Sequence, residues 1–95
     1  MAQVAHSQSV PDQIDWALDY AHDRWSDIPD IAESWAEMDG VERLEFIYEW
    51  AIPQMWFNRL QEWAPLMSPE QRARYEELLA LRERLQPTLD RLLAA

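Results

Sequence analysis

The sequence lacks cysteine and lysine, and Gly40 is the single glycine among its 95 residues. Without cysteine the chain can form neither a disulfide nor a thiolate metal site, which favours a reducing compartment. A single glycine excludes a glycine-rich phosphate-binding loop. β-branched residues are also sparse, so we expect an all-α fold without a sheet. Arginine supplies all eight positive charges.

No segment approaches the roughly 18 consecutive apolar residues that a membrane-spanning helix needs. The first ten residues lack the basic start and the apolar stretch of a signal peptide, so we expect a cytoplasmic protein. The length predicts one domain with a single modest core. We expect residues 1–8 to form a disordered tail and residues 9–95 to form one helical domain.

Charge is distributed unevenly along the chain. Up to Trp63, thirteen acidic residues accompany three arginines, which accounts for the whole net charge of −10. From Ala64 onward, five acidic residues balance five arginines, and all six tryptophans lie in the acidic part. Such acidity repels nucleic acid and anionic membranes. We therefore expect no direct contact with either, and a basic protein as the partner.

Capping signals and a 3.6-residue periodicity predict four to five helices packed as a small bundle. The first helix begins near Ser9, and its apolar stripe runs to Trp25. A second, short helix runs to Met38. Asp39 and Gly40 are expected to end it, because glycine accepts the left-handed conformation that closes helices.

Residues 41–63 form the most apolar part of the chain, and we expect them at the centre of the bundle. At Pro53 the helix is expected either to kink or to restart, because proline removes one backbone hydrogen bond. The last helix, residues 69–95, is expected to brace the bundle. It starts with the capping residue Ser68 followed by Pro69, and Pro87 is expected to bend or split it.

The first helix carries a ladder of aspartates. Five carboxylates recur every three or four residues, within roughly 120° of one another and opposite the apolar stripe: Asp12, Asp15, Asp19, Asp23 and Asp27. Neighbours are about 5–6 Å apart, not far from the phosphate spacing along a nucleic acid strand. Like charges at this spacing destabilise a helix. Either a partner neutralises the ladder, or it is an ordinary solvated face.

Trp16 projects among these aspartates, with Tyr20 at their edge, by the same angular count. An exposed tryptophan beside carboxylates can stack on an arginine guanidinium while the acids pair with its charge. The alternative is that the N-terminal tail or another helix covers Trp16. The candidate partner-binding residues are therefore the five aspartates together with Trp16 and Tyr20.

Residues 41–63 carry two apolar stripes. One consists of Leu44, Ile47, Tyr48 and Ala51. The other lies roughly opposite and consists of Phe46, Trp50 and Phe57. Such an aromatic stripe is buried if the helix is central, or forms the interface of a homo-oligomer, or lines an aromatic ligand pocket. We expect an oligomer and take these three rings as its candidate interface.

No group of residues supports catalysis, a metal or a cofactor. Asp15, Asp19 and His22 have the spacing of a carboxylate–histidine metal motif, but a di-metal bundle needs a second such histidine on another helix. His6 lies in the expected tail, and no serine has a second fixed partner. We therefore expect a protein that is not an enzyme.

The expected function is that of an acidic binding protein that occludes a basic, nucleic-acid-binding surface of another protein. Inhibitors, antitoxins and immunity proteins that mimic nucleic acid belong to this class. The alternative is an obligately oligomeric structural or adaptor subunit whose acidic face serves only solubility. A bundle that holds a metal or an apolar ligand is the least favoured. Added salt separates the first two, because it weakens electrostatic capture and not an apolar subunit contact.

Overall fold

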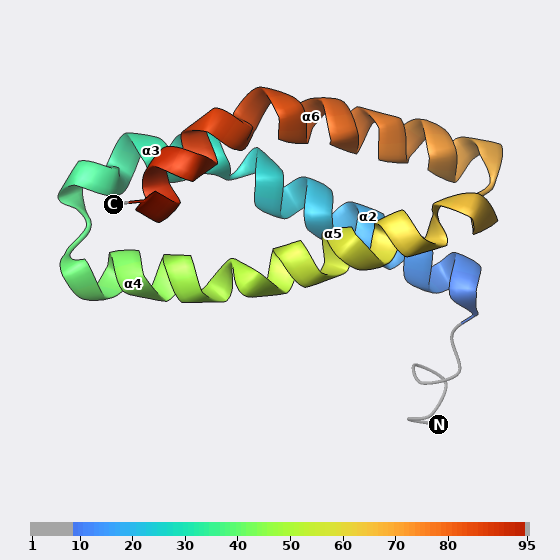
Figure 1. Cartoon of the computed structure of the whole chain (residues 1–95), viewed down its shortest axis with the longest axis horizontal. Coiled ribbons are helices and arrows are strands. Elements are labelled where there is room, and N and C mark those ends of the chain that lie inside the picture. The colour runs from blue at the N-terminus through green and yellow to red at the C-terminus, as the bar shows by residue number, and fades with distance from the viewer. Residues whose placement is uncertain (1–8, 95) are drawn as a thin grey trace.

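Figure 1 shows the computed structural model of the chain, which describes residues 9–94. These residues form helices joined by short turns, with no strand among them, so the all-α prediction is confirmed. The predicted tail, residues 1–8, lies outside the described residues. The elements are α2 (Val10–Ser26), α3 (Ile28–Ser34), the 3-10 helix η1 (Trp35–Glu37), α4 (Gly40–Glu49), α5 (Ala51–Trp63), the 3-10 helix η2 (Ala64–Leu66) and α6 (Pro69–Ala94).

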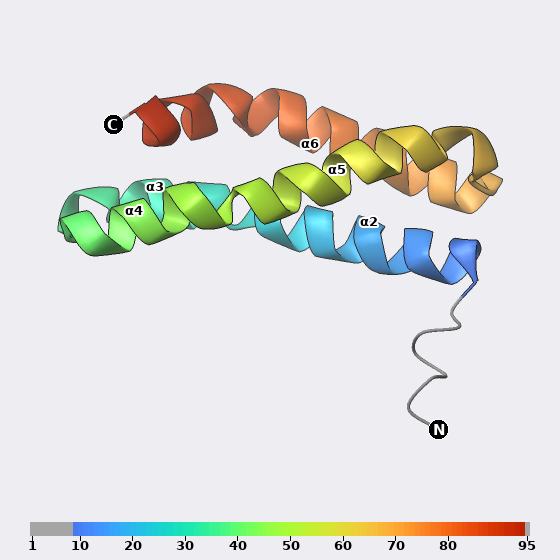
Figure 2. The same ribbon diagram turned by 60° about the horizontal axis from the view of Figure 1, so that its bottom comes forward.

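Consecutive segments continue one another, so the bundle has three long arms instead of the four to five separate helices expected (Figures 1 and 2). α2 passes into α3 through Asp27, whose carbonyl accepts from the Ile31 N–H at 3.0 Å. α4 passes into α5 through Trp50, whose carbonyl accepts from the Gln54 N–H at 3.1 Å. The third arm, α6, runs back antiparallel to the second.

The two prolines inside predicted helices act differently. Pro53 has no N–H that could donate to the Glu49 carbonyl one helical turn earlier. α4 ends at Glu49, the residue whose carbonyl lacks this donor. Pro87 lies within α6, which continues as one helix to Ala94, so the expected split is absent.

The capping residues explain where the helices begin. The Ser9 hydroxyl accepts from the Asp12 N–H at 3.4 Å at the start of α2, as its sequence predicts. The prediction for Gly40 is wrong, because this residue opens α4 and has no positive φ. A reciprocal cap starts α4 there: Asp39 accepts from the Glu42 N–H at 2.8 Å, and Glu42 accepts from the Asp39 N–H at 2.9 Å.

The arm at the centre of the bundle is α2, not residues 41–63 as expected. α2 packs extensively against both α5 and α6, which contact each other far less. Its inner face is at most 2% exposed and consists of Ile14, Ala17, Leu18, Ala21 and Trp25. Ala17 and Ala21 have small side chains, so neighbouring helices can approach α2 closely. The inner face of α2 can therefore pack against both α5 and α6.

The α4–α5 arm turns its aromatic stripe inward. Trp50 and Phe57 are 7% and 1% exposed, and Phe46 packs against the same core. The Trp50 ring meets Trp25 edge-on, with centroids 5.2 Å apart. The candidate oligomer interface is thus corrected for Trp50 and Phe57, which are covered within a single chain because large rings bury the most area in the core, whereas Phe46 is half-buried.

α6 closes the core with Tyr75, whose ring centroid lies 6.3 Å from that of Phe57. Burial raises the pKa of Tyr75, while the positive charges of Arg82 and Arg72 lower it in part. Arg82 places its guanidinium 4.4 Å from the Phe57 ring centroid.

No helix of the described residues is long and apolar enough to cross a membrane.

Candidate functional site

The aspartate ladder lies on the outer face of α2, as its spacing predicts. Four of the five predicted aspartates are exposed and Asp27 is half-buried. Because α3 continues α2, three further acidic residues extend the same row at spacings of three and four: Asp30, Glu33 and Glu37. The eight carboxylates extend over 25 residue steps from Asp12 to Glu37, or about 37 Å at 1.5 Å per residue. We call this set the acidic row.

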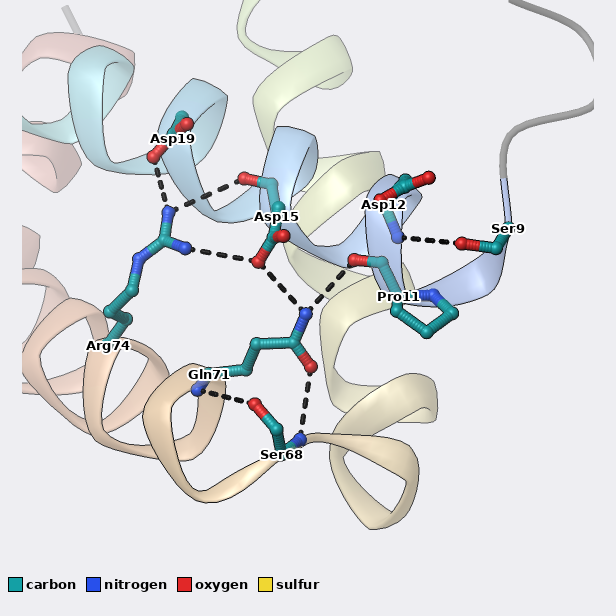
Figure 3. Close-up of polar contacts among 8 residues, drawn as sticks. All are labelled: Ser9, Pro11, Asp12, Asp15, Asp19, Ser68, Gln71 and Arg74. Atoms are coloured by element: carbon teal, nitrogen blue, oxygen red, sulfur yellow. Dashed lines mark hydrogen bonds and ion pairs between the residues drawn. The ribbon is translucent and has the colours of Figure 1, made fainter.

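Three members of the acidic row are paired within the chain, two of them with Arg74 (Figure 3). The Arg74 guanidinium of α6 forms ion pairs with Asp15, at 3.2 Å, and with Asp19. These contacts are exposed, with 39% of the Arg74 side chain accessible. At the far end of α2, Asp27 pairs with Arg24 at 2.7 Å. Arg74 of α6 thus places a positive charge beside the middle of the ladder.

The carboxylates of Asp12 and Asp23 form no hydrogen bond or ion pair with any of the described residues. They lie on either side of the paired section, and both are exposed. These two aspartates therefore remain free to neutralise charge on another molecule.

Gln71 joins the start of α6 to the start of α2 and is 6% exposed (Figure 3). Its amide nitrogen donates to the Pro11 carbonyl at 3.0 Å and to Asp15 at 2.9 Å. Its amide oxygen accepts from the Ser68 N–H at 3.1 Å, and the Ser68 hydroxyl accepts from the Gln71 N–H at 3.1 Å. The cap is predictable from the Ser68–Gln71 spacing, but the bonds to α2 are not.

Replacement of Gln71 by alanine is expected to cost about 1–3 kcal/mol, because it removes one half of the reciprocal cap with Ser68 and both hydrogen bonds from this nearly buried side chain to α2. Arg74→Ala should cost less than about 1 kcal/mol, because its ion pairs are exposed to solvent. Urea unfolding followed by tryptophan fluorescence gives both values. An equal loss in the two variants would contradict the role assigned to Gln71.

Trp16 is 48% exposed and is held by two neighbouring rings. It stacks on Tyr20 with centroids 5.1 Å apart and planes 7° apart. It also meets Trp56 of α5 edge-on, at 4.9 Å. One side of the indole is thus covered by another helix, and the remaining half faces solvent in a fixed orientation.

The free carboxylates flank the stacked rings. Asp12 lies four residues before Trp16, and Asp23 lies three residues after Tyr20, spacings that make side chains neighbours on a helix. A group that covers the exposed half of Trp16 therefore has a carboxylate within reach on each side. We call Asp12, Trp16, Tyr20 and Asp23 the aromatic–acidic face.

A groove of about 200 Å³ adjoins this face at Tyr20. It lies between α2, α3 and the α4–α5 arm, and its walls combine rings with the carboxylate of Glu49 and the ion pair of Arg24 with Asp27. Trp50 also lines it, and the Trp50 indole N–H is buried without a hydrogen-bond partner among the described residues. Its volume is below the roughly 300–1,000 Å³ of small-molecule pockets, and suits a single side chain.

The residues considered for a metal are engaged elsewhere. Asp15 and Asp19 pair with Arg74, and the His22 ring nitrogen lies 3.4 Å from the Ser26 hydroxyl. Residues 9–94 contain no group of three or more acidic or histidine side chains placed to hold a metal ion.

Comparison with known proteins gives no relative: no family model, no curated protein and no solved structure matches this chain.

Proposed function

We propose that this chain is a cytoplasmic, non-enzymatic acidic binding protein that occludes a basic, nucleic-acid-binding surface of a partner protein through α2. The observation that carries the proposal is the half-exposed Trp16 ring, held by Tyr20 and Trp56 beside two unpaired carboxylates. Such a face matches arginine, whose planar guanidinium stacks on an aromatic ring while it pairs with carboxylates.

The fixed orientation of Trp16 supports this role. Binding usually costs about 0.5–1.5 kcal/mol for each flexible side chain that becomes ordered. Because contacts at 5.1 and 4.9 Å already hold the ring, little of this cost remains for Trp16. The neighbouring groove offers a second position for an arginine side chain, between aromatic walls and the carboxylate of Glu49.

The acidic row supports a partner that ordinarily binds nucleic acid. Its length of about 37 Å is close to one turn of a DNA duplex, about 34–36 Å. Its neighbouring carboxylates are about 5–6 Å apart, so arginines placed to contact successive phosphates would meet successive carboxylates. The net charge of −10 also attracts a basic partner over a distance.

Inhibitors, antitoxins and immunity-type proteins act by this kind of occlusion, and the proposal places the chain in that class by its chemistry. The alternative, an oligomeric structural or adaptor subunit, is favoured by a different observation. Large apolar side chains of the α4–α5 arm, including Tyr48 at 75% exposure, face solvent. The aromatic–acidic face and these apolar side chains consist of different residues.

Capture from lysate of the source cell tests the proposal. We expect the immobilised chain to retain an arginine-rich protein that elutes as salt rises, because screening weakens exposed ion pairs. A chain carrying Asp12→Asn and Asp23→Asn should retain much less of it. The matched control is Glu70→Gln with Glu76→Gln, which removes the same charge from α6. Equal retention by all three chains would refute a role for the aromatic–acidic face.

A further inference from the structure

The outer side of the α4–α5 arm carries a row of apolar side chains that are half or more exposed. Its members are 50% to 75% exposed: Val41, Leu44, Tyr48, Ile52 and Met55. Contiguous apolar patches on a soluble chain mark interaction surfaces, whereas single exposed apolar residues need no explanation. We call these five residues the outer stripe.

The outer stripe points directly away from the core. At about 100° per residue its members fall within roughly 80° of one another, and the buried Trp50 and Phe57 lie on the opposite side. Successive members are three, four, four and three residues apart, a spacing that is symmetric about Tyr48. The stripe therefore matches itself when a second copy is turned end for end about Tyr48.

We propose that the outer stripe binds a second copy of this chain, with the two α4–α5 arms antiparallel and a two-fold axis at Tyr48. Val41 of one copy then lies level with Met55 of the other, Leu44 with Ile52, and Tyr48 with its own equivalent. A two-fold dimer uses the same patch on both subunits. The symmetric spacing meets that requirement, which an apolar stripe for an unrelated partner has no reason to meet.

Charge at the ends of the stripe also fits a second copy. Arg59 continues the stripe one helical turn beyond Met55; its side chain is 54% exposed, and its ion pair with Glu62 is long, at 3.6 Å. In the antiparallel pair, Arg59 lies level with the turn before α4 of the other copy, where Glu37 and Asp39 are exposed. The dimer thus places opposite charges together at both ends.

The flank of the stripe gives the dimer a distinctive response to salt. Glu45 and Glu49 line this flank, are exposed, and form no ion pair with the described residues. The two-fold axis places this flank beside the same flank of the other copy, so like charges meet. Because salt screens their repulsion, the dimer should tighten as salt is added. Capture of a basic partner by α2 responds in the opposite direction.

The size of the stripe predicts moderate affinity. Stable, specific interfaces bury about 800 Å² on each partner. Five large side chains, each half or more exposed, supply the apolar centre of such an area, while the carboxylates around it oppose association. We therefore expect dimers at micromolar concentrations in salt.

Oppositely charged substitutions of Tyr48, the residue at the two-fold axis, test this dimer. Tyr48→Glu and Tyr48→Arg each place two like charges together, so each variant alone should dimerise at least tenfold more weakly than the wild type. An equimolar mixture of the two should recover the dimer, because Glu then meets Arg. Tyr48 is exposed in the single chain, so both variants should keep the helical circular dichroism of the wild type. Sedimentation equilibrium at roughly 0.05 and 0.5 M salt, a range across which screening changes strongly, measures all four samples.

Three results would overturn the proposal: a wild-type chain that stays monomeric in high salt, variants that dimerise as well as the wild type, or a mixture that stays monomeric. Asp12→Asn with Asp23→Asn serves as the control, since it changes only exposed carboxylates of α2 and should leave the dimer intact. Failure of the dimer therefore leaves the proposed function untouched, and failure of partner binding by α2 leaves the dimer untouched.

Discussion

Replacement of Trp16 by alanine is expected to weaken the complex with the basic partner by about 2 kcal/mol or more, roughly 30-fold, as for interface hot spots. The half of the ring that faces solvent is the part that a guanidinium would cover. Asp12→Asn and Asp23→Asn should each cost less, about 0.2–1 kcal/mol, because exposed ion pairs contribute that much. Isothermal titration with the captured partner measures all three losses.

Two controls separate loss of the ring from loss of the fold. Trp16→Phe keeps an aromatic ring against Tyr20 and Trp56, so it should bind better than the alanine variant. Tyr48→Ala removes a more exposed ring from a different arm and should leave binding unchanged. If Trp16→Ala bound as well as the wild type, the stacking assigned to this residue would be wrong.

Phe57→Ala is expected to destabilise the chain by about 3–5 kcal/mol, because it leaves a cavity in the core. The Phe57 ring is 1% exposed and contacts Tyr75 and the guanidinium of Arg82. Tyr48→Ala lies on the opposite side of the same arm and should change stability by less than about 0.5 kcal/mol. Thermal unfolding, with the low-salt monomer as the sample, compares the two.

This pair of variants tests which side of the α4–α5 arm faces the core. A large loss for Tyr48→Ala with little loss for Phe57→Ala would mean that the arm is rotated by half a turn. The dimer at the outer stripe would then be refuted as well, because Tyr48 would be buried within one chain.

The helix starts were predictable because their signals are local. At these starts, side-chain acceptors of Ser9, Ser68 and Gln71 lie next to backbone N–H groups that the first turn leaves free. The prediction for Gly40 was wrong because two local signals compete there. Glycine was expected to end a helix, but Asp39 and Glu42 form a reciprocal cap that starts one.

The rotation of the α4–α5 arm was not predictable from periodicity. Both sides of this arm are apolar, so a pattern of spacing cannot decide which one is buried. The decision depends on Trp25 and Tyr75, which come from other arms and offer rings to Trp50 and Phe57. For the same reason no local signal identified α2 as the central helix.

The candidate site was predictable in its residues and not in its pairing. Periodicity placed Trp16 among the aspartates of one helix face, and the structure has it there, half exposed. The pairing of Asp15 and Asp19 with Arg74 joins residues more than fifty positions apart in the sequence. The extension of the acidic row onto α3 was missed because the first and second helices were expected to be separate, whereas Asp27 continues the backbone hydrogen bonds.

The central claim, that α2 recognises arginine by stacking and by charge together, is tested most directly with two peptides of equal length and charge, one rich in arginine and one rich in lysine. We expect the chain to bind the arginine peptide more tightly, because lysine has no planar group to stack on Trp16. Both affinities should fall as salt rises, and Trp16→Ala should abolish the difference between the peptides. Equal affinity of the wild type for the two peptides, unchanged by Trp16→Ala, would contradict the claim.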